Sequence, residues 1–114
     1  MVCVWQIFIS YNLRLSFALA SYIILWNWTD QGIRNAKDSP QRYESFKKDL
    51  EKVGGKLVGG YYTMGKYDGV IILEAPNDEV VMKIMLATAS LGNVRTKTLK
   101  AFPHEEGAKI MESL

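Results

Sequence analysis

The sequence has few of the residues that usually build metal and redox sites. Its 114 residues include one cysteine, Cys3, and one histidine, His104. A single cysteine excludes a disulfide within one chain and any cluster of thiolate ligands from one chain. A single imidazole leaves no His-rich metal site. We therefore expect neither a bound metal nor another cofactor.

A surplus of charge of one sign is also missing. Fourteen basic residues face twelve acidic ones, so the formal net charge is +2. This charge is too small to indicate nucleic acid or an anionic membrane as a partner. Hydrophobic residues make up 48% of the chain and charged residues 23%, which is typical of a globular domain. We expect one α+β domain with a cytoplasmic location.

Charge is nearly absent from residues 1–20, where Arg14 is the one charged side chain. Three interpretations of this apolar N-terminal extension stay open: an upstream reading of the start, a targeting or membrane-surface segment, or an extra element packed on the domain. Gln6, Asn12 and Arg14 interrupt the apolar run, which disfavours a stable transmembrane helix. We expect no membrane partner unless residues 1–20 are a real anchor, and we assign the domain to residues 21–103.

The first half of the domain shows a strand followed by a helix. Residues 21–28 are rich in β-branched and aromatic side chains over the length of a strand. Ser39 and Pro40 are typical of a helix start, with the serine as cap. The following apolar residues recur at helical spacing and predict a helix over residues 40–53: Tyr43, Phe46, Leu50 and Val53.

The second half adds a hairpin, a helix, a strand and a tail. Residues 56–64 and 70–75 read as strands joined by the 65–69 turn, where glycines flank the connection. Asn77 with two following acids predicts the cap of a second helix that Gly92 ends. Residues 93–102 form the last predicted strand, and residues 104–114 a short tail helix.

The order β-α-β-β-α-β predicts a ferredoxin-like fold: an antiparallel four-stranded sheet with both helices on one face and the first and third strands in the centre. The first strand is apolar on both faces, since Ile24 and Trp26 alternate with Ile23 and Leu25. Two helices cover one face only. We therefore expect a homodimer through the open sheet face.

One predicted polar cluster lies at the end of the first strand. We expect the first and third strands to run in one direction and the second and fourth in the other, which brings this end close to the start of the fourth strand. Arg34 and Arg95 would meet there beside Trp28 and bind a carboxylate or phosphate. The alternative is an arginine salt bridge to Asp30 or Glu74.

The same strand directions place a second cluster, in the 65–69 hairpin, at the opposite edge. Tyr67 beside Asp68 suggests a phenol tuned for proton transfer, with Lys100 and His104 nearby. The alternative is structural, because an aspartate in a turn usually accepts bonds from backbone amides.

Aromatic residues form a third feature: Trp26, Trp28, Tyr61 and Tyr62. On neighbouring strands they would wall an apolar ligand cavity between the sheets of two subunits. The alternative is an ordinary aromatic core or dimer interface.

Three segments of the chain together resemble the GYD domain family. They read Trp-Asn-Trp-Thr-Asp-Gln-Gly-Ile-Arg at 26–34, Tyr-Tyr-Thr-Met-Gly-Lys-Tyr-Asp-Gly at 61–69 and Ser-Leu-Gly-Asn-Val-Arg-Thr-Lys-Thr at 90–98. Gly65, Tyr67 and Asp68 match the residues that give the family its name. The resemblance implies small bacterial or archaeal proteins with a ferredoxin-like fold that pairs into a dimeric α/β barrel. It implies no activity, so no catalytic residue is carried over, and it favours an upstream start for residues 1–20.

The leading functional hypothesis is a non-enzymatic dimeric module that binds a small, partly apolar ligand or a protein. Its candidate ligand-binding residues are Trp26, Trp28, Arg34, Tyr62, Tyr67, Asp68 and Arg95. The alternative is a cofactor-free enzyme of the monooxygenase, isomerase or decarboxylase type. Such an enzyme would use Tyr67 with Asp68, or Asn27 with Arg95, around an aromatic cavity.

Overall fold

The structure is a computed structural model, and it describes residues 19–114. The elements follow the predicted order and include a helix within the predicted tail segment, while a short helix and a 3-10 turn are additional: β1 (Ala20–Trp28), α2 (Asp30–Arg34), η1 (Ala36–Asp38), α3 (Ser39–Lys52), β2 (Lys56–Tyr62), β3 (Gly69–Ala75), α4 (Asp78–Ser90), β4 (Val94–Ala101) and α5 (His104–Glu112). β1 begins at Ala20, one residue inside the expected extension, and the rest of that extension up to residue 18 lies outside the described residues.

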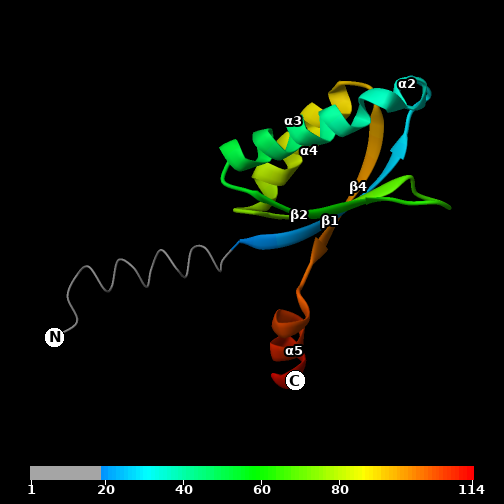
Figure 1. Cartoon of the computed structure of the whole chain (residues 1–114). Helices are drawn as coiled ribbons and strands as arrows, with labels where there is room; N and C mark the ends of the chain where they lie inside the picture. Colours follow the sequence, from blue (N-terminus) through cyan, green and yellow to red (C-terminus); the bar gives the residue numbers. More distant parts are fainter. Residues whose placement is uncertain (1–18) are drawn as a thin grey trace.

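The four strands form one antiparallel sheet in the order β2-β3-β1-β4. α3 and α4 both lie over one face of this sheet (Figure 1). The predicted ferredoxin-like α+β fold and the central position of β1 and β3 are therefore confirmed.

The predicted strand directions are wrong. β1 is antiparallel to both β3 and β4, so β1 and β2 run one way and β3 and β4 the other. The physical reason is that a helical crossover makes the strands it joins parallel, while the hairpin reverses the chain. The β2-β3 hairpin consequently lies beside the end of β1, next to the Trp26↔Gly69 pair. Lys100 pairs with Tyr22 near the other end of β1, so it cannot join the hairpin cluster.

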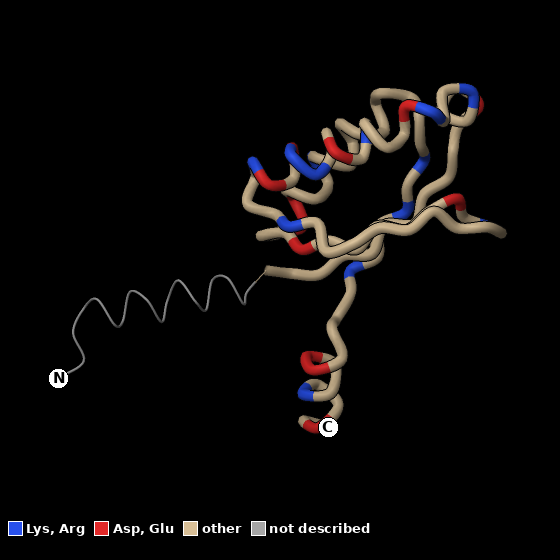
Figure 2. Tube along the Cα trace, viewed as in Figure 1, with Lys and Arg blue, Asp and Glu red and all other residues tan. Residues whose placement is uncertain are grey.

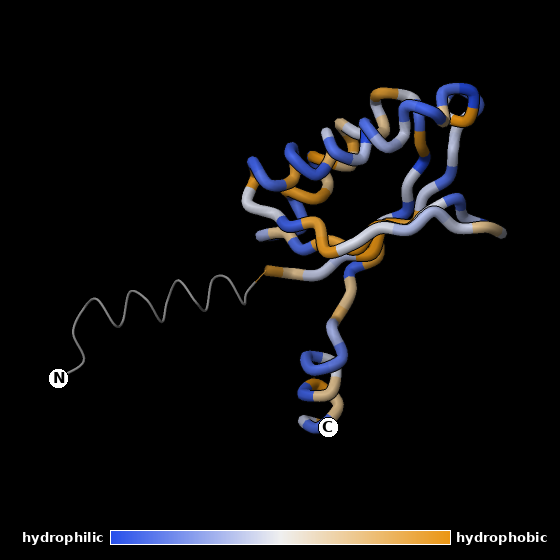
Figure 3. Tube along the Cα trace, in the orientation of Figure 1, coloured by the Kyte–Doolittle hydropathy of each residue, from blue (hydrophilic) through white to orange (hydrophobic). Residues whose placement is uncertain are grey.

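The helix-covered face of the sheet carries the core. Ile24 and Leu73 from the central strands are fully buried, as is Leu50 from α3. Val81, Ile84 and Met85 of α4 complete the same cluster. Figure 3 shows hydrophobic positions gathered along the strands and the inner sides of these helices. This burial of apolar area supplies most of the stabilisation of the two layers.

The other face of the sheet, which we call the open face, is also apolar at its centre. Leu25 pairs with Val70, and Ile23 pairs with Ile72 and Leu99, in registers that alternate with the core positions. β1 and β3 are therefore apolar on both sides, as predicted for β1. α3 and α4 leave the open face uncovered, and α5 extends away from the sheet (Figure 1).

The start of α3 differs from the prediction. Asp38 occupies the cap position without a side-chain bond, and Ser39 is the first helical residue. The Ser39 hydroxyl instead hydrogen-bonds the Tyr62 hydroxyl at 2.9 Å, which ties α3 to β2. Upstream, Thr29 caps the unpredicted helix α2 by accepting a bond from the Gly32 amide. The five residues of α2 are too few for a periodic signal.

A polar contact secures α4 to the sheet near the start of β1. The Tyr22 hydroxyl donates to Asp78 Oδ1, and Lys100 Nζ lies 3.2 Å from the same oxygen. Burial and the Asp78 contact raise the pKa of Tyr22 to about 12. The hydrogen bonds from Tyr22 and Lys100 lower the pKa of Asp78. Each shift links the folding stability to pH.

These shifts predict losses of stability on both sides of neutrality. A raised folded pKa means that the Tyr22 contribution is present below about pH 10 and is lost as pH rises toward 12. The depressed pKa of Asp78 means that its contribution is lost as pH falls through the folded value. Urea unfolding between about pH 8 and 11 should show a steeper decline for the natural chain than for Tyr22→Phe. Parallel profiles would contradict this prediction.

Candidate functional site

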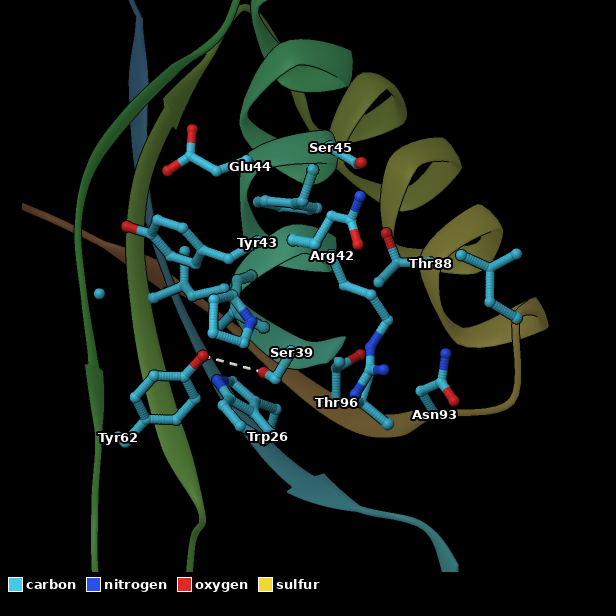
Figure 4. A pocket seen from close by; sticks show the side chains of 18 of the residues that line it. Trp26, Ser39, Arg42, Tyr43, Glu44, Ser45, Tyr62, Thr88, Asn93 and Thr96 are labelled. Atoms are coloured by element: carbon cyan, nitrogen blue, oxygen red, sulfur yellow. Dashed lines mark hydrogen bonds between the residues drawn. The ribbon is translucent and has the colours of Figure 1, made fainter. Parts of the chain in front are cut away.

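A cavity opens between α3 and the sheet, beyond the end of the packed core. Its volume is about 850 Å³, which is within the range of small-molecule sites. Trp26 and Trp28 of β1, Tyr62 of β2, Arg42 and Tyr43 of α3, and Thr96 of β4 line it. Figure 4 shows the side chains converging from both layers, including those of Trp26, Arg42, Tyr43, Tyr62 and Thr96.

Three aromatic rings form the wall at the hairpin end of the cavity. The Trp26 and Trp28 ring centroids are 4.8 Å apart in an edge-on arrangement. The Tyr62 ring lies 5.9 Å from Trp26 and stacks with Trp28 at 6.5 Å. A Cβ at Gly69 would clash with the Trp26 indole. The glycine of the hairpin therefore allows the tryptophan to lie flat across β3.

Three of the four aromatic residues lie on the opposite face of the sheet from the one expected. Trp26, Trp28 and Tyr62 face the helices, so they do not wall a space between two sheets. A bulge between Leu57 and Gly59 shifts the alternation of β2 by one residue. As a result, Tyr62 is opposite Gly69 on the helix side, and Tyr61 pairs with Val70 on the open face. A strict two-residue alternation cannot detect such a bulge.

Arg42 is a cavity residue that the sequence did not single out. Its Nη1 atom donates to the Asn35 carbonyl oxygen at 3.1 Å. The guanidinium carbon lies 5.9 Å from the centre of the Trp28 ring. Nη2 is buried and has no hydrogen-bond partner within residues 19–114. Charges of both signs alternate along the exposed side of α3 (Figure 2). Arg42 is half-buried at the border of that side, four residues before the buried Phe46, and this spacing is the one signal in the sequence that could have distinguished it.

The hairpin cluster is joined to the end of β1 through Asp68. Asp68 Oδ2 accepts from the Trp28 amide at 2.8 Å and from Asn27 Nδ2 at 3.3 Å. The Asp68 amide in turn donates to the Trp26 carbonyl at 2.9 Å. The carboxylate thus takes the place of a backbone carbonyl as the acceptor for the Trp28 amide, just beyond the last β1–β3 pair. Gly65 provides the positive φ of +106° that the turn needs.

Tyr67 lies between two ammonium groups rather than in the cavity lining. Lys66 Nζ is 5.7 Å and Lys97 Nζ 5.6 Å from the centre of its ring. Both distances suit cation–π attraction.

Because both carboxylate contacts of Asp68 go to N–H groups of β1, these contacts position the hairpin and hold it against β1.

Arg34 and Arg95 are both exposed, on α2 and β4. Neither lines the cavity under α3. Arg95 lies opposite Asn27 in the β1–β4 register. The expected alternative, a salt bridge to Asp30 or Glu74, is not found: within residues 19–114 the ion pair present joins Lys100 to Asp78. An anion site shared by the two arginines stays a prediction.

No group of three or more metal-ligating side chains occurs in the part of the chain that the structure describes. Across the same residues, no helix has both the length and the apolar character needed to cross a membrane.

The Asp68 contacts predict a graded loss of stability on substitution. Asp68→Ala leaves the half-buried Trp28 amide without an acceptor and should lower the free energy of unfolding by about 1–3 kcal/mol. Asp68→Asn keeps an acceptor oxygen and should lose less. Chemical denaturation of the three proteins measures the difference. Equal free energies of unfolding for the alanine variant and the natural chain would show that the contact does not stabilise the fold.

Comparisons with known proteins agree with this architecture. A family model described as GYD domain matches residues 22–111. A protein of Thermus thermophilus, named "Glutamine synthetase and cystathionine beta-lyase binding protein", is 35% identical over 86 residues, which cover 75% of this chain and 90% of that protein. The crystal structure of MtbAldR superposes with a TM-score of 0.52 at 13% identity, over 90% of this chain and 74% of that one, a likeness of fold alone. The chain belongs to the GYD domain family.

Proposed function

We propose that this chain is a non-enzymatic binding module that pairs with a second copy of itself and engages other proteins. The observation that carries the proposal is the open face, whose apolar centre is left uncovered by α3 and α4. A continuous apolar patch of this kind usually marks an interaction surface. Closed two-fold dimers are the commonest way in which such a face is buried.

The open face has the composition of an interface core. Ile23, Leu25, Val70 and Ile72 lie on the two central strands and are partly shielded by their neighbours. Leu99 on β4 is 48% exposed and Tyr61 on β2 is 65% exposed. Interface cores are typically depleted of charge and enriched in aromatic residues. The charged residues Arg95 and Lys97 lie along β4 at the edge of the sheet, where a polar rim is expected.

α5 supports self-association independently. It has nine residues, none of them buried, and it stands apart from the two layers (Figure 1). Isolated helices of this length are marginal in water. Gly107, Ile110 and Met111 recur at helical spacing on one side of α5, and the apolar Leu114 follows the end of the helix. In the proposed dimer this side of α5 packs on the second copy, which would stabilise the helix.

The relative from Thermus thermophilus supports the engagement of other proteins, because its name describes it as a binding protein of two enzymes. We infer for this chain a function of the same kind, with partners to be identified. The enzyme alternative is less favoured. Tyr67, Asp68, Asn27 and Arg95 are not among the residues that line the cavity, and Asn27 and Asp68 are hydrogen-bonded to each other.

A charge at the centre of the open face should separate the dimer. Ile72→Glu would place a carboxylate in the apolar interface, at a high desolvation cost. Leu86→Glu is the matched control, because Leu86 is an exposed apolar residue on α4. Sedimentation velocity should give about twice the chain mass of 12.9 kDa for the natural chain and the control, and the monomer mass for Ile72→Glu.

Two further measurements keep this test decisive. Circular dichroism shows whether Ile72→Glu is folded, and Leu99→Glu, at a more exposed position of the same face, provides a second variant. A natural chain that stays monomeric at about 100 μM, well above the dissociation constant of a specific dimer, would contradict self-association. It would leave the binding of other proteins to be tested separately by affinity measurements with candidate partners.

A further inference from the structure

The geometry points to a binding site for a small monocarboxylate with an apolar or aromatic body in the cavity under α3, with Arg42 as the group that binds the carboxylate. This site is on the opposite face of the sheet from the proposed dimer interface, so it does not depend on self-association.

The first support is the state of the Arg42 guanidinium. It lies inside the cavity and one of its nitrogens, Nη2, is buried without an acceptor in residues 19–114. Buried polar groups of folded proteins nearly always have a partner, and an unpaired buried charge is costly. The acids Asp38, Glu44 and Asp49 also border the cavity, but the ion pair found among the described residues involves none of them. Because Nη2 is covered in this structure, a turn of the guanidinium about its Nη1 bond would bring it to an anion in the cavity, which would supply the missing acceptor.

The second support is the way in which the guanidinium is held in place. The Nη1 bond to the Asn35 carbonyl and the Trp28 ring restrain its position. A guanidinium restrained in this way has less freedom to lose on binding. Figure 4 shows the Arg42 side chain reaching from α3 toward Thr96 and Asn93. The Asn93 side-chain oxygen already accepts a bond from Gln31 at 3.0 Å, which leaves its amide nitrogen as a second donor.

The third support concerns the body of the ligand. Trp26, Trp28 and Tyr62 present aromatic surface to the cavity, and Ile71 adds aliphatic surface. A largely apolar lining with a few convergent polar groups is typical of sites for small organic ligands. A single guanidinium balances one negative charge. A phosphate, which carries close to two, would leave excess charge in a partly desolvated space.

Phenylacetate is a suitable probe, because it joins one carboxylate to one aromatic ring. We expect the purified full-length chain to bind it in a chloride-free buffer, with a calorimetric signal and a change in tryptophan fluorescence. Arg42→Met keeps the aliphatic stem and should weaken binding about 30- to 100-fold, as the loss of a charge-assisted hydrogen bond implies. Lys48→Met is the matched control, because it removes one cation from the exposed side of the same helix, and it should leave the affinity unchanged.

Ligand controls test the chemical class. Benzyl alcohol lacks the charge and should bind at least about 30-fold more weakly than phenylacetate. Phenyl phosphate carries the larger charge and should also bind more weakly. Absence of phenylacetate binding by the natural chain would overturn the proposal, as would equal binding by Arg42→Met or tighter binding of phenyl phosphate.

Further variants separate the role of the Arg42 charge from an effect on folding or on self-association. If Arg42→Met fails to fold, Arg42→Lys keeps the charge without the planar two-point geometry and should still weaken binding. The Ile72→Glu variant should bind phenylacetate like the natural chain, because the cavity and the open face lie on opposite sides of the sheet. Failure of dimerisation and failure of ligand binding are thereby distinguished in the same set of proteins.

Discussion

The structure depends on one constraint: the central strand β1 is apolar on both of its faces. Tyr22, Ile24 and Trp26 of this strand point to the helices and are buried there. Ile23 and Leu25 point the other way, opposite Ile72 and Val70 of β3. Apolar surface on both faces of a strand favours a cover on each side. The chain supplies one cover in α3 and α4, and a second copy is the simplest source of the other.

The same strand also sets the shape of the candidate ligand site. Its C-terminal end extends past the packed core, where Trp26 and Trp28 line the cavity. Asp68 holds this end in place by accepting a hydrogen bond from the Trp28 amide. Gly69 leaves room for the Trp26 ring. The hairpin residues that characterise the family therefore act on the cavity indirectly. They fix the aromatic wall against which the Arg42 guanidinium rests.

The two proposals assign different kinds of binding to the two faces of the sheet. The open face is suited to a protein surface, because it is apolar at its centre and bordered by charges. The cavity on the helix side is suited to a small molecule, because it is concave and contains a fixed cation. Since β1 contributes to both, the proposed ligand site and the proposed dimer interface share one structural element.

Much of the fold could be predicted from the sequence because its signals are periodic. The apolar stripe that includes Phe46 and Leu50 indicated α3, and Asn77 indicated the start of α4, where it accepts the Val80 amide. The features that the sequence did not predict depend on a short segment or on a single contact. The five residues of α2 are too few for periodicity, and Ser39 bonds to Tyr62 across the cavity instead of capping its helix. Strand direction is not a periodic property either, since it follows from the parallel relation of strands joined by a helix.

The candidate site was less predictable than the fold. The aromatic residues were identified, but the bulge after Leu57 decided which tyrosine faces the helices. Arg42 was not recognised, because a charged residue at the border of the apolar stripe, four residues before Phe46, is usually solvated. Its significance comes from burial of one nitrogen and from the position of Trp28, both of which are properties of the tertiary structure. Asp68 was identified in the hairpin, but its bond to β1 required the correct strand directions.

The most direct test of the double coverage of β1 is an intermolecular nuclear Overhauser experiment on a sample that mixes two differently labelled preparations of the chain. We predict contacts between copies from the methyl groups of Ile23, Leu25 and Ile72, and none from Ile24 or Leu73 of the core. Intermolecular contacts absent from the open-face methyl groups, or observed from the core residues instead, would contradict the claim that a second copy covers the open face.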